Sequence, residues 1–194
     1  MKTAAFEVLR NLQLAARANS VAVPFGEKNE PRWQGIGYQL GGVRLVSSMG
    51  EVLEVLKVPR YTPVPGVREW MLGIANVRGR LIPIIDLHSY LGIEQTLPQA
   101  LARVLVVEAG PLVAGLVVEA SLGISHFALS SFEPPGEEVP TAFAPIVRGI
   151  YRQGGRVFHE ARLSGLLGEE KFHKVALFVD EVTERRERRS AMEL

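Results

Sequence analysis

The sequence predicts a mostly β protein made of two similar small subdomains, and three observations support this fold class. Short apolar segments alternate with tight glycine turns along most of the chain. A segment of twenty residues recurs further along the chain without a gap. Helical periodicity is confined to the two ends and to short Leu-rich segments. Many short strands with frequent glycine turns are typical of small barrels or of a sandwich.

The composition fits a folded cytoplasmic domain. Of 194 residues, 47% are hydrophobic and 22% charged, and the net charge is +1. This apolar content is enough for a buried core, and the charge gives no field that attracts nucleic acid or an acidic membrane. The sequence has no cysteine, which excludes disulfides, and shows neither a signal-peptide pattern nor an apolar segment long enough to span a bilayer.

The first element expected is a helix over residues 1–19, because apolar side chains recur on one face at helical spacing. We expect this helix to pack on the main body, the alternative being a helix that binds a partner or a membrane surface. Residues 20–35 carry proline, glycine and charge without a period, so they are expected to form a linker.

The β region begins at Ile36 with a half-buried hairpin. Gly41-Gly42 is expected to form a two-residue turn between two strands. The turn predicts two cross-strand pairs on one face: Leu40 with Val43, and Tyr38 with Leu45. Similar hairpins are expected around Gly110-Pro111 and Gly154-Gly155.

The later part of the chain is expected to end in a loop, a helix and a tail. Residues 130–142 are rich in proline and acid, which predicts a loop. Helical texture returns after Ser164 and runs towards Ala176. Residues 179–194 form a tail of mixed charge that we expect to be solvated.

The internal repeat aligns residues 73–92 with residues 149–168 at an offset of 76, with seven of twenty positions identical. Each copy reads as a strand, a glycine turn, a second strand and a short helical turn. The division between the two subdomains is expected near residues 97–102. Features present in one copy alone are candidates for function. They are Asn76, Arg78, Pro83 and Asp86, with counterparts Arg152, Gly154, His159 and Arg162. Pro83 is expected on an edge strand, where its missing N–H faces away from the ladder.

Catalytic motifs are missing from the sequence. It has no Walker-type phosphate loop and no Gly-x-Ser-x-Gly elbow, so a small hydrolase is a weak alternative. Asp86 and His88 lie two residues apart, but a lone Asp-x-His is weak support for a metal site. Asp86 is instead expected to cap a helical turn that starts at His88. We therefore expect no enzymatic activity and no cofactor.

The segment from Gly73 to Leu87, GIANVRGRLIPIIDL, closely resembles the central motif of CheW-like domains. Residues 49–58 and the proline-rich residues 62–66 resemble the parts of that family that precede the motif. The resemblance covers residues 36–178. It implies two tandem SH3-like five-stranded β-barrels with an N-terminal helix and a short C-terminal helix. The implied barrel halves are residues 36–98 and 99–178, between which strands may exchange.

The same resemblance implies an adaptor without catalysis or cofactor. Family members bind the regulatory domain of a CheA-type histidine kinase and the cytoplasmic tip of a methyl-accepting chemoreceptor. The helix, linker and body together resemble the adaptors that control type IV pili and twitching motility. The implied location is the cytoplasm, in receptor arrays, with the membrane reached only through the receptor.

The resemblance also implies which residues bind the partners: Arg78, Asn76, Arg80, Glu54 and Val52. Arg78 leads this set, because an arginine in a tight turn can offer a planar set of donors to a partner. The alternative is that Arg78 bonds only within its own barrel. Asn76 could equally shape the turn.

A different class of function is a small barrel that binds single-stranded nucleic acid. Such sites combine a basic groove with aromatic stacking faces. Aromatic residues make up only 7% of this sequence, and the net charge is near zero. We therefore expect no nucleic acid among the partners.

Overall fold

The computed structural model describes residues 31–110, 112–170 and 172. The expected N-terminal helix, most of the expected linker and the charged tail lie outside these residues. The described part is mostly β, and its strands form two sheets, which confirms the expected fold class.

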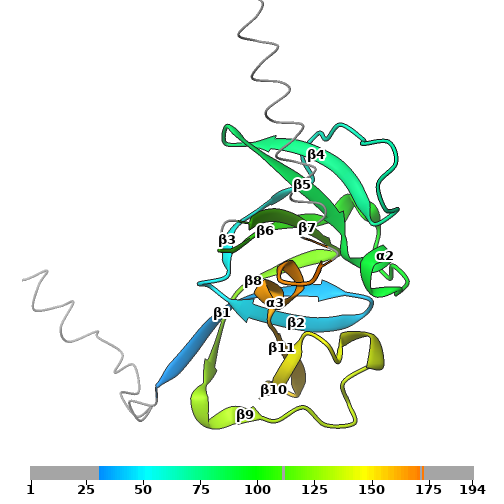
Figure 1. Cartoon of the computed structure of the whole chain (residues 1–194). Helices are drawn as coiled ribbons and strands as arrows, with labels where there is room; N and C mark the ends of the chain where they lie inside the picture. Colours follow the sequence, from blue (N-terminus) through cyan, green and yellow to red (C-terminus); the bar gives the residue numbers. More distant parts are fainter. Residues whose placement is uncertain (1–30, 111, 171, 173–194) are drawn as a thin grey trace, which may run out of the picture. The chain divides into compact units, whose positions relative to one another are not determined.

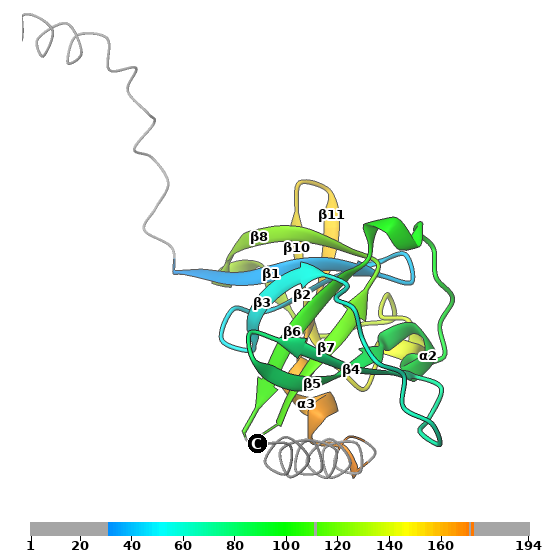
Figure 2. The same ribbon diagram turned by 90° about the horizontal axis from the view of Figure 1, so that it is seen from above.

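The two sheets lie one above the other (Figures 1 and 2). The six-stranded sheet has the order β8 (Ala120–Ala128), β1 (Arg32–Leu40), β2 (Val43–Ser48), β11 (Arg156–Ala161), β10 (Val147–Gln153) and β9 (Phe132–Glu133). The five-stranded sheet has the order β3 (Val52–Lys57), β6 (Arg103–Ala109), β7 (Leu112–Val118), β5 (Arg80–Asp86) and β4 (Met71–Val77). Neighbouring strands are antiparallel except for two parallel pairs, β2 with β11 and β5 with β7.

Five strands of each sheet follow the same plan. Hairpin β1–β2 corresponds to β6–β7, and hairpin β10–β11 corresponds to β4–β5. Strands β3 and β8 are exchanged, because each follows a hairpin of one sheet and joins the other sheet. Each sheet therefore takes strands from both sides of residue 98.

The internal repeat is confirmed by the positions of the elements. Strands β4 and β5 followed by helix α2 (Leu87–Leu91) match β10, β11 and helix α3 (Leu163–Leu167) at the expected offset. Both copies also have a register shift near the start of the hairpin, at Gly73 and at Gly149. The rest of the helix expected towards Ala176 lies largely outside the described residues.

The expected hairpin at Gly41-Gly42 is confirmed in its register. Leu40 pairs with Val43, and Tyr38 pairs with Leu45. Both glycines have a positive φ, as a two-residue turn of this kind requires. The other two expected hairpins are present as β6–β7 and β10–β11.

Three expectations from the sequence need correction, and aromatic contacts explain two of them. Strand β1 begins at Arg32, inside the expected linker, and the ring of Trp33 stacks on Tyr151 at 5.2 Å. The expected loop of residues 130–142 contains the short strand β9, whose Phe132 also packs on Tyr151. These contacts stabilise strands at positions where proline and charge dominate the local pattern.

The third correction concerns Pro83, which does not lie on an edge strand. Strand β5 stands between β7 and β4 in the five-stranded sheet. Pro83 pairs with Ile74 of β4, whereas the ladder to β7 begins one residue later, at Ile84. An interior strand can therefore carry this proline, because the ladder to β7 does not extend to it.

The apolar core has three parts. The largest cluster draws on both sheets, with Tyr38 and Leu45 from one and Leu105 and Leu116 from the other. A second cluster belongs to the five-stranded sheet alone, and side chains from its edge strands β3 and β4 pack against it. A third cluster in the six-stranded sheet consists mainly of aromatic rings. The site described next lies where the edges of the five-stranded sheet meet.

Candidate functional site

The turn between β4 and β5 holds an arginine in an unusual backbone conformation. Arg78 has a φ of 51° and is the only non-glycine residue with a positive φ in the described part of the chain. The corresponding turn of the second repeat has Gly154 and Gly155 at φ of 56° and 73°. A residue with a Cβ adopts this left-handed conformation at a cost of about 1–2 kcal/mol. Conformational strain of this kind is often found at functional sites.

The side chain of Asn76 shapes this turn. Its Oδ1 accepts a hydrogen bond of 2.8 Å from the backbone N–H of Gly79. Asn76 thus holds Arg78 and Gly79 in place, while its own contact with a partner stays a prediction.

Arg78 pairs with Glu54 across the two edges of the five-stranded sheet. The distance from Arg78 Nη2 to Glu54 Oε2 is 2.6 Å. Glu54 lies on β3 and Arg78 follows β4, which are the first and last strands of this sheet. The arginine side chain is 81% exposed and the glutamate only 21%. Both residues of the pair were predicted from the sequence to bind partners. Because the arginine side chain is mostly exposed, its guanidinium still has N–H donors that face solvent.

Arg80 and Val52, the other two predicted site residues, lie in different environments. Arg80 is exposed on the same rim, and its Nη1 lies 3.9 Å from Glu108 Oε1. Val52 is only 7% exposed and belongs to the main core, so it offers almost no surface to a partner. A register shift between Val52 and Glu54 leaves Leu53 pointing outward, 51% exposed. Leu53 is therefore the apolar side chain that β3 presents beside Arg78.

A pocket of about 190 Å³ opens beside this turn. Its lining combines apolar and charged side chains: Leu53, Glu54, Val77, Arg78, Arg80, Ile82, Val106 and Val113. Four of the five predicted partner-binding residues thus lie together at one end of the five-stranded sheet: Glu54, Arg78 and Arg80 line the pocket, and Asn76 stabilises the turn beside it. The fifth, Val52, is buried in the main core.

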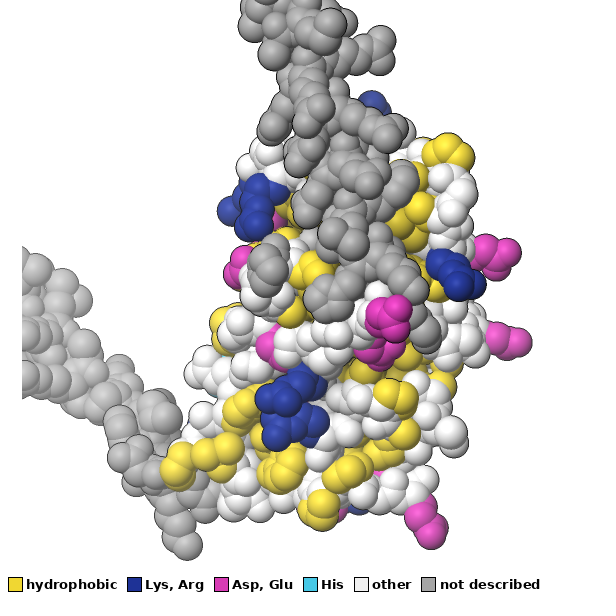
Figure 3. Space-filling model, viewed as in Figure 1, with side chains coloured by type: hydrophobic (Ala, Val, Ile, Leu, Met, Phe, Trp, Pro, Cys, Tyr) yellow, Lys and Arg dark blue, Asp and Glu magenta, His cyan; other side chains and the backbone are white. Residues whose placement is uncertain are grey.

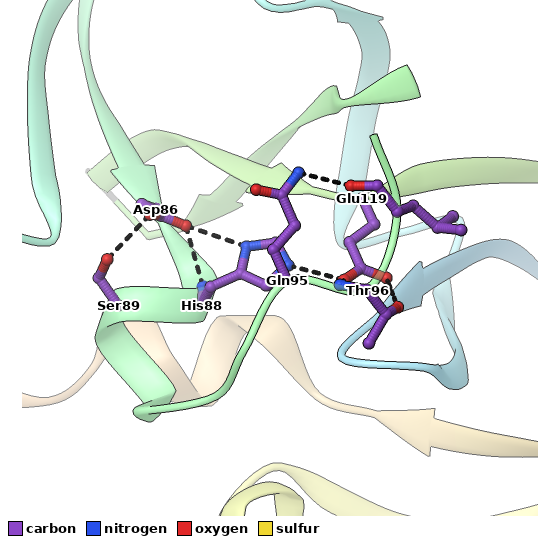
Figure 4. Close-up of polar contacts among 7 residues, drawn as sticks. Asp86, His88, Ser89, Gln95, Thr96 and Glu119 are labelled. Carbon is purple, nitrogen blue, oxygen red and sulfur yellow. Dashed lines mark hydrogen bonds and ion pairs between the residues drawn. The ribbon is translucent and has the colours of Figure 1, made fainter. Parts of the chain in front are cut away.

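A second polar cluster lies at the start of α2, where His88 stands between two carboxylates (Figure 4). Asp86 is the N-cap residue and accepts a hydrogen bond from the backbone N–H of His88, which confirms the expected cap. The ring Nδ1 of His88 lies 3.1 Å from Asp86 Oδ1, and its Nε2 lies 3.3 Å from Glu119 Oε1. Glu119 is fully buried and also accepts hydrogen bonds from the backbone N–H and the hydroxyl of Thr96.

Each charged form in this cluster is stabilised by hydrogen bonds from its neighbours. Burial works to raise the pKa of Asp86 and of Glu119, but hydrogen bonds from His88, Ser89 and Thr96 outweigh it and lower both pKa values. The hydrogen bond to Asp86 raises the pKa of His88 by more than burial lowers it. The two carboxylates beside the ring thus favour the protonated form of His88, in which both ring nitrogens donate hydrogen bonds.

This second cluster connects elements of the fold. Within residues 31–110, 112–170 and 172, no group of three or more His, Cys, Asp or Glu side chains is placed to hold a metal ion. Glu119 lies between β7 and β8, and its backbone N–H donates to the carbonyl of Gln39 on β1. The cluster therefore links α2 to both sheets. No pattern in the sequence pointed to Glu119, which is 31 residues from His88.

One face of the molecule exposes apolar side chains (Figure 3). They are spread over the lower half, where Figure 1 shows β1, β2 and β10, with Lys or Arg side chains beside them. Large exposed apolar residues of the six-stranded sheet include Leu122 and Ile124 on its edge strand β8. None of the described helices is long and apolar enough to span a membrane.

Comparison with protein families matches residues 34–171 to the CheW-like domain. The chain belongs to the CheW-like domain family. Protein PilI of Pseudomonas aeruginosa is 39% identical over 148 residues, which cover 76% of this chain and 83% of PilI. Protein FrzA of Myxococcus xanthus is 30% identical over 98 residues, which cover 50% of this chain and 61% of FrzA.

A solved structure supports the same assignment. The scaffolding protein TtCheW from Thermoanaerobacter tengcongensis matches with a TM-score of 0.64 and 28% identity, over 73% of this chain and 96% of TtCheW. Members of the CheW-like family are scaffold or adaptor proteins rather than enzymes. The resemblance found in the sequence, including its similarity to a pilus adaptor, is confirmed.

Proposed function

We propose that this CheW-like chain couples a methyl-accepting chemoreceptor to a CheA-type histidine kinase in a system that controls type IV pili and twitching motility. The similarity to PilI over most of both chains supports the motility system. The family supports the adaptor role. The adaptor works in the cytoplasm, within receptor arrays, and binds the regulatory domain of the kinase and the cytoplasmic tip of the receptor.

The observation that carries the proposal is the exposed arginine in the β4–β5 turn. Arg78 stands in a strained conformation although its repeat counterpart is glycine. Its guanidinium is mostly exposed beside a pocket and is only partly satisfied by Glu54. An arginine held in this way can bind a carboxylate or backbone oxygens of a partner with two parallel hydrogen bonds.

An adaptor of this size acts by linking several modest contacts. Interfaces in signalling complexes are often small, and each alone gives moderate affinity. When the receptor and the kinase are held by one chain, each binding event raises the effective concentration for the next. The adaptor role therefore needs two separate surfaces on the molecule rather than one tight site.

The experiment exchanges the charges of the Arg78–Glu54 pair. Wild type, Arg78→Glu, Glu54→Arg and the double variant are compared for binding to a kinase regulatory domain and to a receptor cytoplasmic fragment from the same cell. Arg78→Glu should weaken binding of at least one partner by about 2 kcal/mol, or roughly thirtyfold, without loss of fold by circular dichroism. The double variant restores an ion pair between the sheet edges but should not restore binding.

Two results would contradict the proposal. Restored binding in the double variant would show that the pair only closes the sheet edges and that Arg78 touches no partner. A wild-type chain that binds neither the kinase domain nor the receptor fragment would contradict the adaptor role itself.

A further inference from the structure

The two sheets carry different side chains at matching positions of the repeat. In the six-stranded sheet, the rings of Phe127 and Tyr151 stack at 4.6 Å, and Phe158 meets Phe127 edge-on at 5.2 Å. Trp33 completes this cluster from β1. Aromatic rings of the chain itself therefore fill the third apolar cluster, in the six-stranded sheet.

The five-stranded sheet has small or aliphatic side chains at the corresponding places. At the repeat offset, Ala75 matches Tyr151 and Ile82 matches Phe158. These are equivalent cross-strand pairs, because Ala75 faces Ile82 and Tyr151 faces Phe158. Both members of each pair lie in the apolar cluster of their own sheet. The five-stranded sheet thus lacks the two rings that Tyr151 and Phe158 supply in the six-stranded sheet.

The pocket at the β4–β5 turn opens on the five-stranded sheet, and Ile82 is one of its lining residues. Its floor is apolar and buried, with Ile82, Val106 and Val113 below and Val77 beside them. Its volume is about 190 Å³. An apolar cavity of about 150 Å³ is large enough to hold a benzene ring. One aromatic side chain therefore fits the space.

The rim of the pocket favours a negative charge next to that ring. The guanidinium groups of Arg78 and Arg80 are its most exposed charged groups, whereas the carboxylates of Glu54 and Glu108 are less exposed. Arg80 is held only loosely, at 3.9 Å from Glu108. Both arginines can therefore turn donors towards a carboxylate at the mouth.

We propose that this pocket binds a partner segment that inserts one aromatic side chain, with an adjacent carboxylate held by Arg78 and Arg80. The ring from the partner lies against Ile82, whose counterpart in the six-stranded sheet is Phe158. The inference rests on the proposed function, because it specifies what the partner presents to the Arg78 turn.

The direct test uses phenylacetate, which carries a ring and a carboxylate, as a probe for the full chain. Methyl NMR spectra are recorded during a titration, with phenethylamine, a ring with an ammonium group, as the matched control. Phenylacetate should cause saturable shifts in the methyl groups of Val77, Ile82, Val106 and Val113, and phenethylamine should cause much weaker ones. No shift in these methyl groups, or equal shifts with both probes, would overturn the inference.

A variant that fills the pocket separates this inference from the proposed function. Val113→Phe places a ring at the floor of the pocket and should abolish the phenylacetate shifts and weaken partner binding at least about tenfold. Val77→Phe serves the same purpose if Val113→Phe does not fold, and Leu101→Phe, an exposed apolar residue outside the pocket lining, is the control. If wild type and the folded filled variant bind the kinase domain and receptor fragment equally, the inference fails while the proposed function stands. If wild type binds neither partner, the proposed function fails, and the phenylacetate titration still decides whether the pocket takes a ring and a carboxylate.

Discussion

Arg78 occupies a backbone conformation that its counterpart in the second repeat, Gly154, adopts without strain. Asn76 stabilises the turn through a hydrogen bond to Gly79, and the guanidinium of Arg78 pairs with Glu54. An exposed ion pair of this kind contributes at most about 1 kcal/mol to stability. Stability alone therefore does not explain an arginine at this position, which is what the proposed role of Arg78 in partner binding predicts.

Replacing Arg78 by glycine should separate stability from binding. Arg78→Gly relieves the left-handed conformation but removes the pair with Glu54, so the free energy of unfolding should change by less than about 1 kcal/mol. Partner binding should fall as strongly as in Arg78→Glu. Chemical denaturation and a binding assay on the same preparations measure both effects. A stable variant with unchanged binding would contradict the account.

Gly154→Ala measures the conformational cost by itself. A Cβ at Gly154 meets nothing within 4 Å, so only its φ of 56° opposes the substitution. We predict a loss of about 1 kcal/mol in the free energy of unfolding and no change in partner binding. A neutral result in denaturation would mean that the turn adapts freely and that Arg78 carries no strain.

At the scale of the element, helix α2 depends on the groups around its first turn. Asp86 caps the helix, and the ring of His88 lies between Asp86 and Glu119, which raises its pKa. The cap was predictable because an acid precedes a helical turn. The contact with Glu119 was not, because a distant residue reaches His88 only through the packing of β7 beside β5.

The stability of the protein should depend on pH through this cluster. The pKa of His88 is raised in the folded state above its ordinary value near 6.5, so its contribution is complete below that value and is lost as the pH rises through the folded pKa. The lowered pKa values of Asp86 and Glu119 act in the opposite sense, and their contributions are lost in acid.

The measurement compares the melting temperatures of wild type and His88→Gln at pH values from below the ordinary pKa of histidine to above the raised pKa of His88. The difference between them should be largest at mildly acidic pH and should shrink as the pH rises. A difference that is the same at all pH values would mean that folding does not raise the pKa of His88.

Glycine at the start of β4 is required by a close backbone contact. A Cβ on Gly73 would lie 2.3 Å from the carbonyl oxygen of Thr62, and the φ of Gly73 is also positive. Gly73→Ala should therefore lower the free energy of unfolding by more than about 2 kcal/mol. Gly50→Ala is the matched control, because its nearest atom would be Ser48 Oγ at 3.6 Å. Equal stability of the two variants in urea would show that β4 moves away from Thr62.

At the scale of the whole molecule, the exchanged strands make the two sheets dependent on each other. Strand β3 joins the sheet of β6 and β7, and β8 joins the sheet of β1 and β2. The main core also takes side chains from both sheets. Neither half of the sequence contains a complete sheet.

Fragments 1–98 and 99–194 should therefore be largely unfolded when separate. Mixing them should restore the far-UV circular dichroism and the dispersed NMR spectrum of the intact chain, because each supplies strands that the other lacks. A dispersed spectrum from either fragment alone would show that one barrel half folds without exchange.

The sequence predicted local features well and long-range contacts poorly. The hairpins, the repeat and the Arg78 turn follow from glycine spacing, which is a local signal. The interior position of Pro83 and the burial of Val52 depend on strand order and on a bulge, which no local pattern encodes. The pocket is formed by side chains from β3, β4, β5, β6 and β7, so its presence follows only from the arrangement of these strands in space.

The central claim is that one chain holds a receptor and a kinase together. The most direct measurement is size-exclusion chromatography of a receptor cytoplasmic fragment and a kinase regulatory domain, with and without the wild-type chain. The account predicts that receptor and kinase co-elute only when the chain is present, and that Arg78→Glu reduces this complex. Failure to form the three-component complex, or competition of receptor and kinase for the same surface, would contradict it.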